Sequence, residues 1–165
     1  MKFPARLLTF PQPLARVIAR LPAWPPSAAF AAACNRTAWP TLSELDWSAA
    51  YGKRFRVHVK DIGLSMYLSV APHGLKAGKA GPVDVTFTAT AEDFARLSLR
   101  LEDPDTLFFN RRLLIEGDTN LGLTLKNLLD AVDWDELVRR MPLGLGMLLR
   151  TIRQRAFQIS TPALD

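Results

Sequence analysis

Cysteine and histidine, from which most metal, redox and nucleophilic sites are built, are nearly absent from this chain. Its 165 residues include one cysteine, Cys34, and two histidines, His58 and His73. A single cysteine excludes an internal disulfide and favours a reducing compartment, and two isolated histidines supply no set of metal ligands at a known spacing. Cys34 lies in an alanine-rich stretch without an evident activating partner, so we interpret it as a small core residue.

Short motifs for nucleotide binding and acyl transfer are also missing. The sequence contains no Gly-x-Gly-x-x-Gly, no Gly-Lys-Ser/Thr and no Gly-x-Ser-x-Gly. Glu102, Asp103 and Asp105 form an acidic cluster, but its place beside Pro104 favours a solvated turn before a strand over an acid–base pair. We therefore expect no catalytic residues, no metal and no cofactor. An enzyme acting on lipid head groups is the weakest alternative.

Long apolar runs are absent too. The longest uncharged stretch near the N-terminus, residues 21–35, is too short to span a bilayer and contains three prolines. Arginines at positions 6, 16 and 20 interrupt any apolar core of a signal peptide. The sequence therefore predicts neither a transmembrane helix nor a secretory signal.

Acidic residues are missing from both ends of the chain. Residues 1–43 contain five basic residues and no acid, and residues 139–158 again contain five basic residues and no acid. Because both ends are also rich in apolar residues, this pattern favours contact with anionic lipid. Basic residues interleaved with stacking aromatics, which would indicate nucleic acid, do not occur, so we expect no nucleic-acid partner.

Two segments are candidates for membrane contact, each with alternatives. The N-terminal arm either packs on the domain as an ordinary helix or touches the membrane. The predicted last helix, Leu143–Gln158, either docks on the core, joins two subunits of a homodimer, or lies in a bilayer interface. The expected membrane-contact residues are Arg16, Arg20, Trp24, Leu145, Leu149, Arg150, Ile152 and Arg153.

Alternating apolar and polar residues dominate the middle of the chain. Residues 54–60, 64–70 and 83–89 alternate as half-buried strands do, and 75–77 and 113–115 are shorter strand candidates. A helix is predicted from Thr90 or Ala91, and another after Asp118, whose carboxylate suits an N-cap. The expected fold is α+β, with a single, roughly five-stranded antiparallel sheet covered by helices.

One segment resembles a known family. Residues 107–123, Leu-Phe-Phe-Asn-Arg-Arg-Leu-Leu-Ile-Glu-Gly-Asp-Thr-Asn-Leu-Gly-Leu, followed by Leu128-Leu129-Asp130, resemble the closing strand–helix unit of the sterol carrier protein 2 (SCP2) family. The paired arginines and the Gly-Asp-Thr are similar to those of bacterial accessory factors of ubiquinone biosynthesis. The resemblance implies an N-terminal arm over 1–38, an SCP2-like lipid-binding domain over 39–132 and C-terminal helices over 133–165.

This resemblance also implies a hydrophobic cavity between sheet and helices, although the same apolar residues fit a filled core equally well. The expected lipid-binding residues are Met66, Leu68, Val85, Phe87, Phe94, Leu97, Phe108, Phe109, Leu113, Ile115, Leu121, Leu125, Leu128 and Leu129.

The function that the resemblance implies is that of a non-catalytic accessory factor in oxygen-independent ubiquinone biosynthesis. Such a factor binds a polyprenylated quinone precursor, ubiquinone or a phospholipid, and presents it to enzymes at the membrane surface. The implied partners are that lipid, an anionic membrane and the biosynthetic enzymes, including the anaerobic peptidase-like hydroxylase pair. The expected location is the cytoplasm, peripheral to the inner membrane. The alternative is a protein–protein scaffold of the biosynthetic complex without a bound lipid.

Overall fold

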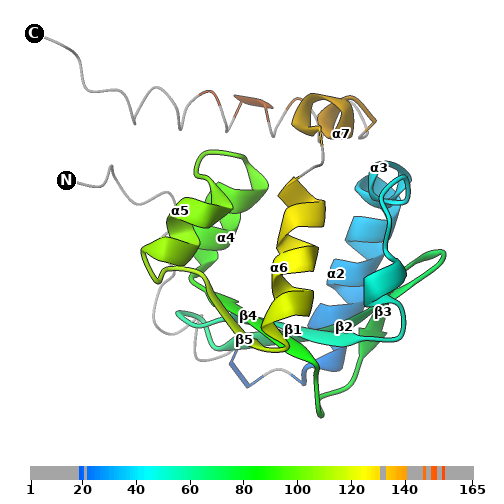
Figure 1. The fold of residues 1–165 in the computed structure, drawn as a ribbon, viewed down its shortest axis with the longest axis vertical. Helices are drawn as coiled ribbons and strands as arrows, with labels where there is room; N and C mark the ends of the chain where they lie inside the picture. The colour runs from blue at the N-terminus through cyan, green and yellow to red at the C-terminus, as the bar shows by residue number, and fades with distance from the viewer. Residues whose placement is uncertain are drawn as a thin grey trace, which may run out of the picture.

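A five-stranded sheet with helices stacked on one side forms the body of the protein (Figure 1). The structure, a computed structural model, describes residues 19–20, 22–130, 133–140, 147, 150–151 and 154. The helical elements are α2 (Trp24–Thr37), α3 (Trp39–Leu42), the 3-10 helix η1 (Ser48–Ala50), α4 (Ala91–Ser98), α5 (Pro104–Phe109), α6 (Thr119–Asp130) and α7 (Trp134–Arg140). The strands are β1 (Arg54–Val59), β2 (Leu64–Ala71), β3 (Gly74–Gly78), β4 (Val85–Ala89) and β5 (Leu114–Gly117). The α+β class is confirmed.

The sheet has the order β3-β2-β1-β4-β5, and one of its pairings differs from expectation. β1 pairs antiparallel with β2 but parallel with β4, so the sheet is mixed instead of wholly antiparallel. The reason is the connection after β3. Residues 79–84 carry the chain past β2 and β1, where the Arg54 guanidinium donates to the Lys79 carbonyl at 2.8 Å. β4 then runs in the same direction as β1.

Side chains alternate across the strands as the sequence predicts. Phe55 and Val57 of β1 lie beside Leu68 and Met66 of β2 on one side. On the other side the same two residues lie beside Val85 and Phe87 of β4, so one face of the sheet is apolar throughout. The register therefore gathers the apolar residues of three strands under the helices.

Buried apolar residues form two clusters. The first joins Trp39, Trp47, Val70 and Val85 to residues of α6, and the two tryptophan rings lie 5.7 Å apart. The second contains Ala89, Leu107 and Leu113, with Phe94 and Leu97 packed against it. α4 and α5 thus cover one part of the sheet, and α6 with α3 covers another.

Two predicted local structures are corrected. The sequence around Cys34 predicts a short helix, Ala28–Cys34, capped by Ser27, but α2 begins at Trp24. The buried Ser27 hydroxyl donates to the Ala23 carbonyl and accepts the Tyr67 N–H instead. The segment after Asp103 is the helix α5 instead of a turn. The Asp103 carboxylate accepts from the Thr106 N–H, and Pro104 occupies the first turn, where proline is well tolerated.

α2 also protects the edge of the sheet. The Asn35 amide group donates to the Leu75 carbonyl at 2.9 Å and accepts from the Leu75 N–H at 2.8 Å. Both backbone groups belong to β3, the edge strand, and would otherwise be open for pairing with another chain. The Asn35 side chain therefore occupies the backbone groups of β3 that a further strand would otherwise bind.

We expect Asn35→Ala to lower the free energy of unfolding by about 1–2 kcal/mol, because two half-buried backbone groups lose their partners. Chemical denaturation measures this change. The matched control is Asn127→Ala on α6, since Asn127 is exposed and its side chain forms no hydrogen bond within the described residues. Equal stabilities of the two variants would contradict a structural role for Asn35.

Candidate ligand-binding site

α6 lies directly on the sheet and forms one wall of the candidate site. Its N-terminus is capped by Asp118, whose carboxylate accepts from the Leu121 N–H at 3.0 Å, as the sequence predicts. One turn on, Gly122 permits the close approach: a β-carbon there would lie 2.3 Å from Ile115 Cγ2 and 3.0 Å from Val85 Cγ2. The helix therefore cannot move closer to β4 and β5.

α4 and α5 form the opposite wall, and both end in the same way. Arg100 follows α4 and Arg111 follows α5, each in the left-handed conformation with φ of 53° and 57°. The Leu101 N–H donates to the Arg96 carbonyl, and the Arg112 N–H to the Leu107 carbonyl, which is the Schellman arrangement. Glycine usually occupies such a position, so an arginine there indicates that its side chain matters.

Ion pairs join α4, α5 and the turn before β5 into one unit. Arg96 lies within α4 and pairs with Glu92 at 2.8 Å and with Glu102 at 3.8 Å. Arg112 pairs with the same Glu102 and with Asp93. Partial burial works to lower the pKa of Arg112, but hydrogen bonds and charge from Asp93 and Glu102 outweigh it and raise that pKa. The most buried residues of α4 are thus the charged Asp93 and Arg96.

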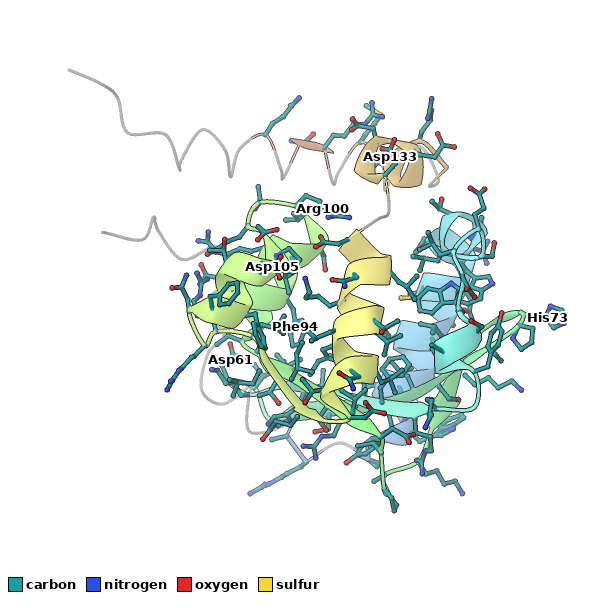
Figure 2. All side chains as sticks on the ribbon, viewed as in Figure 1. Asp61, His73, Phe94, Arg100, Asp105 and Asp133 are labelled. Atoms are coloured by element: carbon teal, nitrogen blue, oxygen red, sulfur yellow. The ribbon has the colours of Figure 1, made fainter. Side chains whose placement is uncertain are left out.

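A different set of ion pairs crosses from this unit to α6. Arg100 Nη1 lies 2.7 Å from Asp130 Oδ1, and Lys126 Nζ lies 2.7 Å from Asp105 Oδ1. Figure 2 shows Arg100 and Asp105 on the side away from the sheet and Phe94 nearer to it. We call the region between α4–α5 and α6 the helix interface. Its sheet side is apolar, and ion pairs lie along its outer side.

The expected lipid-binding residues mostly surround this interface. Leu107 belongs to the same apolar layer, although the sequence did not single it out. Six expected residues are buried: Met66, Leu68, Val85, Leu113, Leu121 and Leu125. Six are half-buried: Phe87, Phe94, Leu97, Phe108, Ile115 and Leu128.

Of the two remaining expected lipid-binding residues, one lies outside this layer. Phe109 is 79% exposed, so it does not belong to the interior. The side chain of Leu129 lies outside what the structure describes. The register explains the difference at Phe109: α5 is a helix, so its neighbour Leu107 turns inward while Phe109 turns outward.

Only part of the expected membrane-contact set can be placed. Arg20 and Arg150 are exposed, and Trp24 is 53% exposed at the first residue of α2. Arg16, Leu145, Leu149, Ile152 and Arg153 lie outside the described residues. In the described part of the chain, no helix combines the length and apolar character needed to cross a bilayer.

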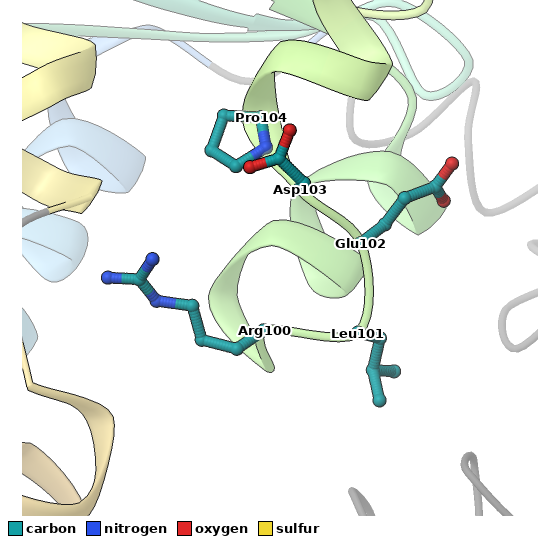
Figure 3. Close-up of a pocket in the computed structure, with 5 residues that line it drawn as sticks. All are labelled: Arg100, Leu101, Glu102, Asp103 and Pro104. Carbon is teal, nitrogen blue, oxygen red and sulfur yellow. The ribbon is translucent and has the colours of Figure 1, made fainter.

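Sequence reasoning missed the charged residues of the interface. Lys126 lies in the predominantly apolar α6, yet it is only 8% exposed. Its partner Asp105 belongs to the acidic cluster whose sequence favours a solvated turn. An open surface pocket of about 240 Å³ lies at the α4–α5 loop, lined by Arg100–Pro104, and Figure 3 shows Arg100 extending from this loop toward α6. The sequence did contain one signal of this charged interface: Lys126 itself, a lysine between apolar positions of a predicted helix.

The histidine and cysteine side chains lie in unreactive surroundings. His58 Nδ1 lies 2.9 Å from Ser65 Oγ on the polar side of the sheet. Burial raises the pKa of the Cys34 thiol to about 11, which disfavours the reactive thiolate. Within the residues that the structure describes, no three histidine, cysteine or acidic side chains are grouped so that they could hold a metal ion.

Comparison with known proteins identifies relatives of this domain. Residues 40–130 match the SCP-2 sterol transfer family. Over 98 residues the chain is 45% identical to the ubiquinone biosynthesis accessory factor UbiT of Escherichia coli strain K12 and equally to that of strain O157:H7. These alignments cover 59% of this chain and 54% of each relative, so the chain spans about half the length of the curated relatives it matches.

A solved structure shows the same fold. The "UbiJ-SCP2 Ubiquinone synthesis protein" superimposes with a TM-score of 0.50 and 23% identity, over 65% of this chain and 95% of that chain. At this identity the likeness concerns the fold alone. The family resemblance expected from residues 107–130 is thereby confirmed.

Proposed function

Because the chain belongs to the SCP-2 sterol transfer family, we propose that it is a non-catalytic, lipid-binding accessory factor of oxygen-independent ubiquinone biosynthesis. Its ligand would be a polyprenylated quinone precursor, ubiquinone or a phospholipid. The helix interface is the observation that carries this proposal: two separate apolar clusters share one sheet face, and ion pairs bridge the helices above them. The name of the relatives that are 45% identical, ubiquinone biosynthesis accessory factor, supports a ligand from the ubiquinone pathway.

The physics of apolar burial suits such a role. A polyprenyl tail is insoluble in water, and each methylene group moved into an apolar layer contributes about 0.8 kcal/mol. A long tail would therefore be held tightly without any polar recognition. α4 and α5 do not pack closely along α6 within the described part of the chain, so side chains, not backbone contacts, hold the two walls together.

Delivery of the lipid requires contact with a membrane and with enzymes. The acid-free basic ends of the chain would bring the protein to an anionic bilayer, where it loads and unloads. At that surface it would present the lipid to the biosynthetic enzymes, including the peptidase-like hydroxylase pair of the oxygen-independent pathway. We propose this peripheral, cytoplasmic location together with the carrier role.

One observation favours a second function. Phe109, the last residue of α5, is 79% exposed. Two residues later, Arg111 has a strained left-handed backbone conformation, and its side chain forms no ion pair with any described residue. An exposed aromatic beside an unpaired arginine is typical of protein interfaces. A scaffold that joins biosynthetic enzymes, or a homodimer, would use this surface with the interior filled.

Lipid extraction followed by mass spectrometry separates these two functions. We expect protein purified from its native host without detergent to carry a quinone, a polyprenylated precursor or a phospholipid in near-stoichiometric amount. An empty protein that takes up no lipid on titration would favour the scaffold.

Membrane contact has its own test. We expect the double variant Arg150→Glu, Arg153→Glu to lose most of its flotation with vesicles that contain anionic phospholipid, because the last helix would then repel the surface. The control is Lys60→Glu, Lys79→Glu, which changes the net charge equally at two exposed residues of the sheet region. Equal flotation of both variants and of the unchanged protein would contradict the proposed role of the basic C-terminal segment.

A further inference from the structure

We propose that the outer edge of β5 is the docking site for a second copy of this chain, and that two β5 strands pair antiparallel across a twofold axis. The two five-stranded sheets then continue into each other. This inference goes beyond lipid binding and holds with or without a bound lipid. It gives Arg111, at the exposed surface after α5, a partner in the second copy.

The two edges of the sheet are covered differently. At β3 the Asn35 amide group binds both the N–H and the carbonyl of Leu75. β5 is the opposite edge, and β4 is its one strand neighbour among the described residues. Three of the four residues of β5 are exposed. An edge strand without cover offers its backbone groups to a further strand, so β5 is the edge at which the sheet can be extended.

The register of β5 against β4 determines which backbone groups face outward. The Asp118 N–H donates to the Asp84 carbonyl at 2.8 Å, and this pair continues the β4–β5 register. Hydrogen-bonded and non-bonded pairs alternate along antiparallel strands, so Leu114 and Glu116 bond to β4. Ile115 directs its N–H and carbonyl away from β4 and is the central backbone contact for a new strand.

The charges along this edge favour a second copy over an unrelated strand. Arg111 precedes β5 and Glu116 lies near its end; both are exposed, and neither forms an ion pair with a described residue. In antiparallel pairing the start of one strand meets the end of the other, so Arg111 of each copy lies beside Glu116 of the other. The same contact then occurs twice, as a twofold axis requires.

Leu114 supplies the apolar centre of this contact. Its side chain is 38% exposed, and it lies on the sheet face away from α6 because its neighbour Ile115 faces Gly122. Leu114 of one copy opposite Leu114 of the other makes a non-bonded pair at the axis, where side chains of paired strands approach most closely. In this register the backbone of Ile115 bonds to the other copy, and Glu116 comes next to its Arg111.

Analytical ultracentrifugation over a series of protein concentrations, without added lipid, measures this association. β5 has four residues, so the contact area is small and the dimer is weak. We expect the unchanged protein to shift from a monomer of 18.4 kDa to a species of twice that mass as its concentration rises.

Charge reversal identifies the contact. Arg111→Glu alone and Glu116→Arg alone should each weaken the dimer about tenfold, because each places like charges together at both ends of the paired strands. An equimolar mixture of the two variants should restore it, since both contacts in the mixed dimer again join opposite charges. The control Lys60→Glu, at an exposed residue after β1, should associate as the unchanged protein does.

Three results would overturn the proposal. A protein that stays at 18.4 kDa up to its solubility limit would leave the β5 edge to a strand of another protein. A dimer that neither single variant weakens would show that the two copies meet through a different surface. Two weakened variants whose mixture stays monomeric would show that Arg111 and Glu116 do not face each other. Because no lipid enters the assay, each of these results leaves the proposed lipid-binding function unaffected.

Discussion

The close contact of α6 with β4 and β5 is the constraint on which the rest of this structure depends. Gly122 lets the helix backbone approach Ile115 and Val85, and a larger residue would meet both. With α6 fixed at this height, Leu121 and Leu125 complete one apolar cluster. The stripe of α6 that contains Lys126 then faces α5. On the same face of the sheet, α4 and α5 cover the apolar surface that α6 leaves uncovered.

Electrostatics divides the helical layer into two units. The pairs among Asp93, Arg96, Glu102 and Arg112 hold α4, α5 and the turn before β5 together. Arg100 and Lys126 take part in the pairs that cross to α6. Buried ion pairs contribute little net stability compared with apolar packing, but breaking one partner is costly. Such contacts suit an interface that opens only when a ligand replaces what is lost.

Much of the fold follows from local sequence patterns. The strands β1 and β2 and the capped starts of α4 and α6 were predicted because alternation and N-cap residues act within a few neighbours. The parallel pairing of β1 with β4 was not, since which strands become neighbours depends on the path of residues 79–84. α5 was missed because Asp-Pro is a signal for a turn as well as for a helix start.

The candidate site, like the fold, was predicted only in part from the sequence. Its apolar residues were predicted from periodicity, because a helix or strand that faces a core must present them at regular spacing. Its charged residues were not. Whether Lys126 extends to water or is buried against Asp105 depends on where α5 lies, and no local pattern contains that information. Phe109 shows the converse: an aromatic residue expected inside turned out to be exposed.

The position of a bound chain is the most direct measure of whether the helix interface holds a lipid. A dodecanoic acid with a photoactivatable diazirine at mid-chain can be irradiated in the complex, and the labelled residues located by mass spectrometry. We expect labels on Phe94, Leu107, Leu125 and Leu128, from both walls of the interface. Labels confined to Arg56, His58 and Tyr67, on the opposite face of the sheet, would contradict a binding site between the helices.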